Sequence, residues 1–527
     1  MYRENVIIKD WRDIDLSFGL IYPNTYKIGM SSYSIRLLYY LINCYDNIVC
    51  ERIFLPDNVT FPASKDYSSE NTIRSIENKV HPNEFDILGF SFQFENDFKN
   101  IFWILEKAGI PLTHADRKKE VDKGNVNYPI IIGGGPVITS NPMPLSKIFD
   151  FCFIGDVEKK LEDMLQKILL YKSNEIDLQE LLTRIKKIDG IFVPSLNNKV
   201  NRVVLENLDE SPVPEFQLMS KPSGAQPIFE ENFFLEINRG CPFQCKFCIS
   251  SFHNYPYRIR SFEDIKRAIE EGIKHSNFDT ISLIGPCVSS HPKFYEICEY
   301  VLRRGKRLTV PSIRIEHLTS NIIKILEKSN VNTITIAPES GSEKLRFSLG
   351  KKISDEQIFS VLMKLKKSKI KNVKFYFLIG LPDETEDDIE NIITFLKKVS
   401  ELGFEKNALR VNVNPLIPKL NTPYEKKVDF YLKDNFNLFL SKFKMIEKEL
   451  KELSSIKLKF QNPKSIMNKA RLQTILSLGN AEVFNLLLQY YSYGSSFGAL
   501  RRAEKNSNFS LDEYLLRIKS GYSPWTF

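Results

Sequence analysis

Residues 236–248 read EINRGCPFQCKFC, and the three cysteines of this stretch decide how the rest of the chain is interpreted. Cys241, Cys245 and Cys248 follow a short apolar run that we predict to be a strand, so the thiols leave the strand end in one loop. A CxxxCxxC loop can place three thiolates around three corners of one cubane, because iron-sulfur clusters are held by cysteine thiolates. The spacing therefore predicts a catalytic 4Fe-4S cluster with these three cysteines as its ligands.

The other five cysteines are poor candidates for a fourth ligand. Cys287 and Cys298 lie in the next strand-helix unit, and Cys44, Cys50 and Cys152 lie in another domain. We therefore expect one iron without a protein ligand, which can chelate the amino and carboxylate groups of a methionine moiety. The alternative is a zinc knot or an electron-transfer cluster, both of which use four ligands, often in two CxxC pairs.

Strands and helices alternate around and beyond the cysteine loop. The six predicted strands span residues 234–238, 280–284, 309–313, 333–337, 373–379 and 409–414. Six strand-then-helix units predict an open, partial (β/α)6 TIM-type barrel whose reactive groups sit at the carboxyl ends of the strands. After residue 423 the pattern becomes mainly helical.

The N-terminal part carries a second set of alternating strands and helices. Its predicted strands span residues 19–22, 48–54, 86–91, 129–132 and 151–154. This order predicts a doubly wound, Rossmann-like α/β domain with a mostly parallel sheet. A short hairpin at 190–208 and a linker with four prolines at 211–227 would follow. The predicted division is an α/β domain (1–188), hairpin and linker (189–228), barrel (229–423) and helical module (424–527).

A glycine turn, GGGP at 133–136, directly follows the fourth predicted strand. Gly134 and Gly135 are candidate cofactor contacts, because the carboxyl ends of parallel strands commonly bind ligands and glycine lets the backbone approach closely. A tight turn alone explains many such runs, so both interpretations stay open. The run is not a GxGxxG fingerprint, which argues against a nicotinamide cofactor.

Composition and charge narrow the class of protein. The chain has 527 residues, 43% hydrophobic and 26% charged, which predicts folded domains throughout. The N-terminal stretch lacks the apolar run of a signal peptide or membrane span, and eight cysteines are too few for a disulfide scaffold. We expect a cytoplasmic protein in a reduced compartment. The net charge of +8 fits solvated lysine-rich helix faces better than a nucleic-acid-binding surface.

The cysteine loop after a first barrel strand resembles the radical S-adenosylmethionine (SAM) superfamily. Other stretches resemble the branch that joins an N-terminal cobalamin (B12)-binding-like domain to the barrel. The likeness covers residues 16 to about 423. It is carried by residues 22–30, 51–54, 89–93, 108–112 and 134–136, and in the barrel by 257–261, 311–314, 337–342, 380–382 and 418–419.

The resemblance implies roles for polar and aromatic residues near the strand ends. Phe247 would lie near the adenine of SAM. Ser312 and Arg314 would lie near its carboxylate, and Glu339 and Ser340 near its ribose. The alternative for Arg314 and Glu339 is an ion pair at the barrel mouth, since buried charges need partners.

Two departures from the family pattern concern cofactors. The resemblance implies that Gly285, at the end of the second strand, contacts the cofactor. Pro286 follows it, so the chain lacks the Gly-Gly-Glu motif that is common at this position in the superfamily. Which residues hold the amino group of SAM therefore stays open. The loop after the first strand reads PNTY at 23–26, where cobalamin domains often carry a histidine. Related folds bind cobalamin without that histidine. Cobalamin binding and a domain that only shapes the substrate pocket are equal alternatives.

The resemblance implies reductive cleavage of SAM and hydrogen-atom abstraction from an unidentified substrate, with electrons from a donor such as ferredoxin or flavodoxin. With cobalamin, methyl transfer or carbon-carbon bond formation is expected. The alternatives are a cobalamin-free modification of RNA or protein, or a non-catalytic iron-sulfur protein. A lipid, a nucleotide, a peptide and a small metabolite all remain open as substrates.

Overall fold

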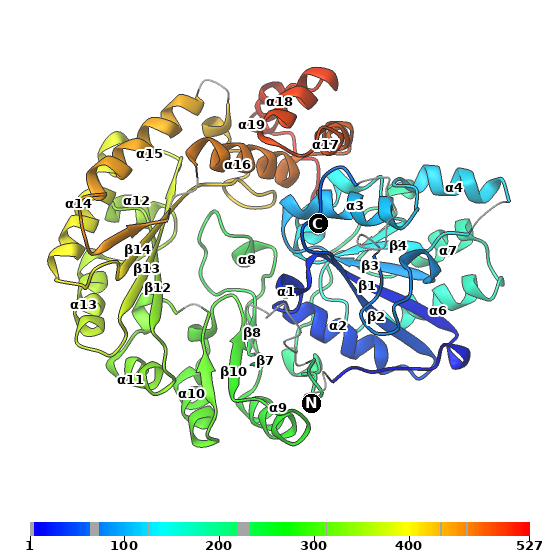
Figure 1. Ribbon diagram of the computed structural model, residues 1–527, viewed down its shortest axis with the longest axis horizontal. Helices are drawn as coiled ribbons and strands as arrows, with labels where there is room; N and C mark the ends of the chain where they lie inside the picture. Colours follow the sequence, from blue (N-terminus) through cyan, green and yellow to red (C-terminus); the bar gives the residue numbers. More distant parts are fainter. Residues whose placement is uncertain are drawn as a thin grey trace.

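The computed structural model describes residues 5–63, 73–124, 127–218, 232–311, 313–432, 435–459 and 462–527. Two α/β units lie side by side, and a group of C-terminal helices contacts both of them (Figure 1). Within the described residues, no helix is long and apolar enough to cross a bilayer.

The N-terminal unit is a six-stranded sheet in the order β2-β1-β3-β4-β5-β6. Its strands are parallel except for the last, which pairs antiparallel with its neighbour. The strands are β1 (Leu16–Thr25), β2 (Ile48–Leu55), β3 (Ile87–Ser91), β4 (Ile130–Gly134), β5 (Phe151–Phe153) and β6 (Ile191–Phe192). Every residue of β2 and β3 is buried, as expected for a sheet covered on both faces.

Helices cover both faces of this sheet. On one face, apolar side chains of α2 (Tyr33–Asn43), α6 (Leu161–Lys172) and α7 (Leu178–Ile185) share a core with the strands. On the other face, α3 (Phe98–Lys107) and α5 (Pro136–Ser140) belong to the larger core. The short helices α1 (Tyr26–Gly29) and α4 (His114–Asp122) complete the unit. The predicted doubly wound class is confirmed.

The hairpin expected at 190–208 is wrong. The strand β6 pairs with β5 at the edge of the sheet, and Val203 forms an isolated parallel bridge with Gly155. An edge strand offers free backbone groups that a nearby segment can pair with, and this long-range pairing competes with a local turn.

The second unit is an arc of parallel strands with helices along its outside (Figure 1). One sheet has the order β11-β10-β7 and the other β12-β13-β14-β15. The strands are β7 (Asn232–Glu236), β10 (Thr280–Ile284), β11 (Arg307–Thr309), β12 (Thr333–Glu339), β13 (Asn372–Ile379), β14 (Leu409–Pro415) and β15 (Ile456–Leu458). Five of the six predicted strands are present, and the third, predicted at 309–313, overlaps β11 only at Thr309. The sequence missed β15, which extends the arc from a segment predicted to be mainly helical.

The outer helices of the arc are α9 (Phe262–His275), α10 (Phe294–Arg303), α11 (Ser320–Lys328), α12 (Glu343–Ser348), α13 (Asp355–Lys366) and α14 (Glu386–Glu401). A small antiparallel ribbon, β8 (Asn238–Arg239) with β9 (Arg258–Ile259), follows β7. Between its strands lie the cysteine loop and α8 (Ile249–Phe252), inside the arc (Figure 1).

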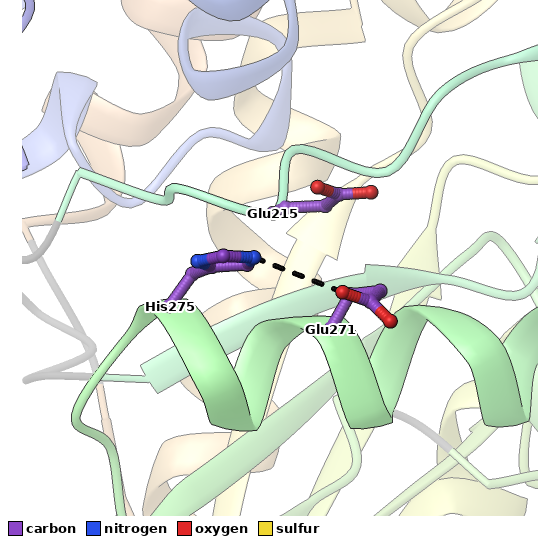
Figure 2. A group of neighbouring side chains, drawn as sticks. All are labelled: Glu215, Glu271 and His275. Carbon is purple, nitrogen blue, oxygen red and sulfur yellow. Dashed lines mark ion pairs between the residues drawn. The ribbon is translucent and has the colours of Figure 1, made fainter.

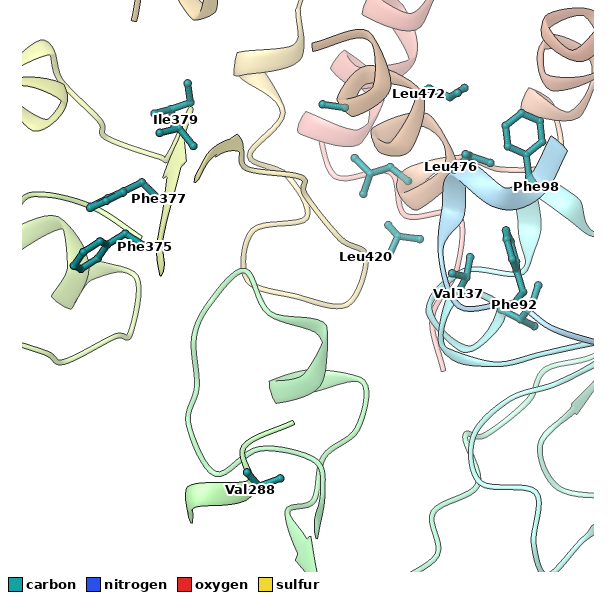
Figure 3. Close-up of a cluster of buried hydrophobic side chains, with 14 of the residues drawn as sticks. Phe92, Phe98, Val137, Val288, Phe375, Phe377, Ile379, Leu420, Leu472 and Leu476 are labelled. Atoms are coloured by element: carbon teal, nitrogen blue, oxygen red, sulfur yellow. The ribbon is translucent and has the colours of Figure 1, made fainter. Parts of the chain in front are cut away.

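The C-terminal helices connect the two units. They are α15 (Phe436–Leu450), α16 (Pro463–Leu478), α17 (Val483–Ser492), α18 (Phe497–Asn506) and α19 (Leu511–Lys519). Figure 3 shows Leu472 and Leu476 of α16 close to Phe98 of α3, and all three belong to one buried cluster. Tyr491 packs edge-on against Phe102, and its hydroxyl donates to the carboxylate of Glu106 at 2.6 Å. These helices therefore extend the core across the junction.

Candidate functional site

The three cysteines of the loop are positioned by backbone contacts on both sides. The N–H of Cys248 donates to the carbonyl of Cys245 at 3.0 Å, and Cys248 is the N-cap of α8. Gly240 has a positive φ of 75°, and a Cβ there would lie 2.4 Å from the carbonyl oxygen of Asn254. Only glycine therefore lets the start of the loop lie against the chain that returns toward β9.

The donor set of the loop fits an iron-sulfur cluster better than a single metal ion. All eight cysteines are free thiols. Among the described residues, only Glu215, Glu271 and His275 bring three potential ligand atoms within 4.8 Å of one another. A tetrahedral zinc ion holds its sulfurs about 3.8 Å apart, so the three loop thiols are too widely spread for one zinc ion. Separate corners of a cubane accept that wider spacing.

The surroundings of the loop also change the pKa values of its cysteines, which matters for metal binding. Burial raises the pKa of Cys245, and the cations of Lys351 and Arg314 offset only part of that rise. A hydrogen bond with the Cys287 thiol, together with burial, raises the pKa of Cys241. Without a metal, Cys241 and Cys245 are therefore thiols, and binding iron would release their protons.

Cys287 corrects an expectation drawn from sequence distance. Its strand, β10, lies directly beside β7 in the sheet, so the loops after both strands open at the same edge. Cys287 follows that strand, and it lines the same cavity as Cys241. A fourth thiol is therefore present at the site, although 46 residues separate the two cysteines along the chain.

A cavity of about 200 Å³ opens beside these two thiols. Arg314 lines it, stacks over the ring of Phe243 at 3.6 Å and pairs with Glu316 at 2.5 Å. Glu339 instead pairs with Lys351 at 2.7 Å, so the alternative of an Arg314–Glu339 ion pair is wrong. Lys351 is also part of the cavity wall.

Phe247 and Ser340, which the resemblance also implies for SAM binding, do not line this cavity. Phe247 packs against an apolar cluster that includes Leu345 and Leu349. Ser340 is buried, and its hydroxyl accepts a hydrogen bond from the N–H of Ser342 at 3.1 Å, which stabilises a turn. Ser312 lies outside the described residues.

A larger cavity of about 580 Å³ lies between the two units. Gly134, Gly135 and Gly285 all line it. The structure therefore brings the glycine turn of the N-terminal unit close to Gly285 of the barrel. At Gly135 a Cβ would lie 2.7 Å from the carbonyl oxygen of Phe92, so the turn itself requires glycine. At Gly134 the nearest atom would be 4.0 Å away, which leaves open space beside the backbone.

The cavity extends into the N-terminal unit between its sheet and its helices. Apolar residues of both layers line this part: Leu20, Ile132 and Phe153 from strands, and Leu38, Ile42, Leu161 and Met164 from α2 and α6. Protein interiors rarely leave voids larger than a water molecule, so a cavity of this size inside an α/β layer indicates a ligand pocket.

A buried ion network closes the junction beside this cavity. Arg239 pairs with Glu236 at 2.7 Å, with Asp156 at 2.9 Å and with Glu158 at 2.9 Å. Arg258 pairs with the second oxygen of Asp156 at 2.6 Å. The ribbon that holds the cysteine loop is thereby tied to the segment after β5. Sequence reasoning assigned no partners to these charges.

The group of Glu215, Glu271 and His275 lies on the outside of α9. Figure 2 shows His275 and Glu271 one turn apart on the helix, with Glu215 on a neighbouring segment. Nε2 of His275 lies 3.7 Å from Glu271, which also pairs with Lys274 at 2.7 Å. Because neighbouring cations already neutralise its carboxylates, we regard the group as an ordinary charged surface.

Comparison with known proteins follows the same division of the chain. The sequence model described as "Radical SAM proteins, N-terminal" matches residues 34–194, and that of the "Radical SAM superfamily" matches residues 235–396. An uncharacterized protein of Methanocaldococcus jannaschii is 29% identical over 502 residues, covering 95% of this chain and 96% of the relative.

Two solved structures share the whole arrangement. The cobalamin-dependent SAM radical enzyme OxsB with aqua-cobalamin bound has a TM-score of 0.57 at 16% identity, covering 95% of this chain and 80% of that one. The radical SAM methyltransferase TsrM from Kitasatospora setae, with cobalamin and a [4Fe-4S] cluster bound, has a TM-score of 0.54 at 11% identity, covering 93% and 99%. At these identities the likeness concerns the fold, which confirms the predicted architecture.

The matched sequence models confirm the resemblance drawn from the cysteine loop. Members of the family use a 4Fe-4S cluster and SAM, and they require a reductant and a substrate. The chain therefore belongs to the radical SAM superfamily and is an enzyme that cleaves SAM.

Proposed function

We propose that Cys241, Cys245 and Cys248 hold the 4Fe-4S cluster and that the cavity of about 200 Å³ receives SAM. When bound there, the cluster would supply the electron for reductive cleavage of SAM, and SAM would supply the chemistry for hydrogen-atom abstraction from the substrate. Arg314 contributes a positive charge to the cavity wall, which suits the carboxylate of the methionine moiety. A low-potential donor such as ferredoxin or flavodoxin supplies the electron.

We also propose that the larger cavity takes cobalamin and that the reaction is a methyl transfer or the formation of a carbon-carbon bond. The observation that carries this proposal is the extension of the cavity between the sheet and helices of the N-terminal unit. An apolar channel of this kind suits a flat aromatic group, and the open space at Gly134 lets a wide ring approach the backbone. OxsB and TsrM, which share the fold, bind cobalamin.

The residues that meet at the larger cavity fit this assignment chemically. Its floor is apolar, while Glu236 and Arg239 of the ion network supply a polar rim on the barrel side. Arg239 is engaged by three carboxylates and Arg258 pairs with one of them, so the network at this rim holds two positive and three negative charges. The substrate would enter between this ligand and the SAM cavity.

One anaerobic experiment tests both the cluster assignment and the cobalamin assignment. The full chain is reconstituted with iron and sulfide, supplied with hydroxocobalamin, and assayed for 5'-deoxyadenosine with dithionite and SAM. We expect a cubane absorption band, a bound corrinoid spectrum, and product in wild type. Cys245→Ala should abolish 5'-deoxyadenosine, while Cys298→Ala, which changes a buried cysteine of α10, should not. Equal product from Cys245→Ala contradicts the cluster assignment, and a spectrum without corrinoid contradicts the cobalamin assignment.

A further inference from the structure

The outer side of the cysteine loop belongs to the protein surface. Pro242, Gln244 and Lys246 are exposed, whereas Cys245 between the last two is buried. Alternate residues of the loop therefore face solvent, and one of the three loop thiols lies directly beneath them. A partner that reaches this side of the loop comes close to the site where we place the cluster.

The helix α12 and the turn that follows it pack directly against the loop. The backbone N–H of Lys246 donates to the carbonyl of Leu349 at 2.9 Å. A Cβ at Gly350 would lie 2.4 Å from the carbonyl oxygen of Gln244 and 3.5 Å from the Cα of Cys245. The exposed side chains of α12 and of this turn are therefore neighbours of the exposed side of the loop.

The exposed face of α12 carries an aromatic ring. Lys344, Phe347 and Ser348 are all exposed, and their spacing of three and four residues puts them on one side of the helix. Phe347 is 44% exposed. A single exposed ring is ordinary on a protein surface, so the charges beside this one decide whether the face binds a partner.

Unpaired positive charges accompany the ring. Three exposed lysines lie on the loop, on α12 and on the turn after it: Lys246, Lys344 and Lys352. None of them forms an ion pair with a side chain in the part of the chain that the structure describes. The only acidic residues from 340 to 355 are Glu343 and Asp355, and both pair with the buried Arg346. An apolar centre with a positively charged rim therefore lies beside the cysteine loop.

We propose that this lysine patch, formed by Lys246, Lys344, Phe347 and Lys352, is the docking surface for the reductant, and that the reductant is a small acidic flavoprotein of the flavodoxin kind. Such a carrier exposes the apolar edge of its flavin within a rim of carboxylates. The lysines attract that rim, and the ring of Phe347 contacts the apolar edge. One electron leaves the reduced flavin and reduces the bound cluster. This inference rests on the proposed ligation of the cluster by the loop cysteines.

The rate of 5'-deoxyadenosine formation from SAM, measured with two different reductants, tests the docking surface. Dithionite is a small ion that needs no docking surface, whereas flavodoxin, reduced by its reductase and NADPH, must bind. The reconstituted full chain is compared as wild type, as Lys344→Glu/Lys352→Glu and as the control Lys119→Glu/Lys187→Glu. Both double variants change the net charge equally. The control lysines are exposed, form no ion pair with a described residue and belong to the N-terminal unit, away from α12 (Figure 1).

We expect the rate with sub-saturating flavodoxin to fall about tenfold in Lys344→Glu/Lys352→Glu at low salt, because charges at an interface rim control the association rate. The control should keep the wild-type rate. Added salt should slow the wild-type reaction with flavodoxin, since it screens exposed charges. Phe347→Ser should also lower the rate with flavodoxin. The rates with dithionite should be equal in all four proteins.

Equal rates with flavodoxin in wild type and Lys344→Glu/Lys352→Glu overturn the inference. An equal loss in the control double variant also overturns it, because the effect then depends on net charge and not on this surface. A wild type that is active with dithionite but not with flavodoxin overturns the choice of carrier, as does a loss in the patch variant that is seen only with reduced ferredoxin. Absence of 5'-deoxyadenosine from wild type with dithionite defeats the proposed cluster and SAM site instead, and it is recognised before any carrier is added.

Discussion

Asp156, which follows β5 of the N-terminal sheet, pairs with Arg258 of β9 at 2.6 Å, so one carboxylate ties the first unit to the ribbon that holds the cysteine loop. The same carboxylate pairs with Arg239 of β8 at 2.9 Å. Both strands of the ribbon are therefore anchored to the N-terminal unit at one residue.

Replacing Asp156 by Asn should destabilise the protein by about 3 kcal/mol, because two buried arginines lose a charged partner. Thermal unfolding at neutral pH, followed by circular dichroism, measures the loss. Asp189→Asn is the matched control, since Asp189 pairs with Lys160 but is 73% exposed on its side chain. Equal unfolding temperatures for the two variants would show that the network contributes little.

The same carboxylate predicts a pH dependence. Burial alone would raise the pKa of Asp156, but Arg239 and Arg258 outweigh burial and hold the pKa below the ordinary aspartate value of 3.8. A lowered pKa in the folded state means that the ion pairs stabilise the protein above the ordinary aspartate pKa, and that this contribution is lost as the pH falls through the lowered value. The stability difference between wild type and Asp156→Asn should therefore shrink below about pH 4. A difference that stays constant down to the acid unfolding limit contradicts this assignment.

Gly240→Ala should reduce the iron content after reconstitution by more than half, because a Cβ would lie 2.4 Å from the Asn254 carbonyl oxygen. Gly305→Ala provides the control. Gly305 also has a positive φ, of 70° against 75° for Gly240, but a Cβ there meets nothing within 4 Å. The control separates backbone strain from the close approach that shapes the loop. Equal iron loss in both variants would assign the effect to strain alone.

Arg314→Ala should weaken SAM binding by about tenfold, the effect of losing one charge-assisted contact. Isothermal titration of reconstituted protein with SAM measures the change. Arg303→Ala is the control, because Arg303 lies on the outside of α10 and its side chain is 74% exposed. Unchanged affinity in Arg314→Ala would mean that its pairing with Glu316 serves the structure only.

Gly134→Leu should reduce cobalamin binding by at least tenfold, because the new side chain enters the larger cavity. No short contact opposes the first carbon of that side chain, so the fold should tolerate the change. Gly498→Leu adds the same volume in α18, where a Cβ meets nothing within 4 Å. Absorption titration with hydroxocobalamin measures both variants. Unimpaired binding in Gly134→Leu places the corrinoid elsewhere or excludes it.

The strand-helix order and the cysteine loop were readable from the sequence because both are local patterns. The alternation of apolar and amphipathic segments predicted five of the six barrel strands and misplaced the third, and the spacing of Cys241, Cys245 and Cys248 predicted an iron-sulfur loop. The hairpin at 190–208 failed because β6 joins a distant edge of the sheet. The strand β15 was missed for the same reason, since its partner β14 lies more than 40 residues earlier.

By itself, the sequence determined the repeating units, the three loop thiols and the glycine turn, since each depends on the chemistry and spacing of neighbouring residues. Tertiary structure alone decided which residues meet: Cys287 and Cys241 at one cavity, Lys351 with Glu339, and Asp156 with Arg258. The physical reason is that parallel strands bring the ends of distant segments to one edge. Contacts at that edge are set by sheet order and packing, which leave no local signature in the chain.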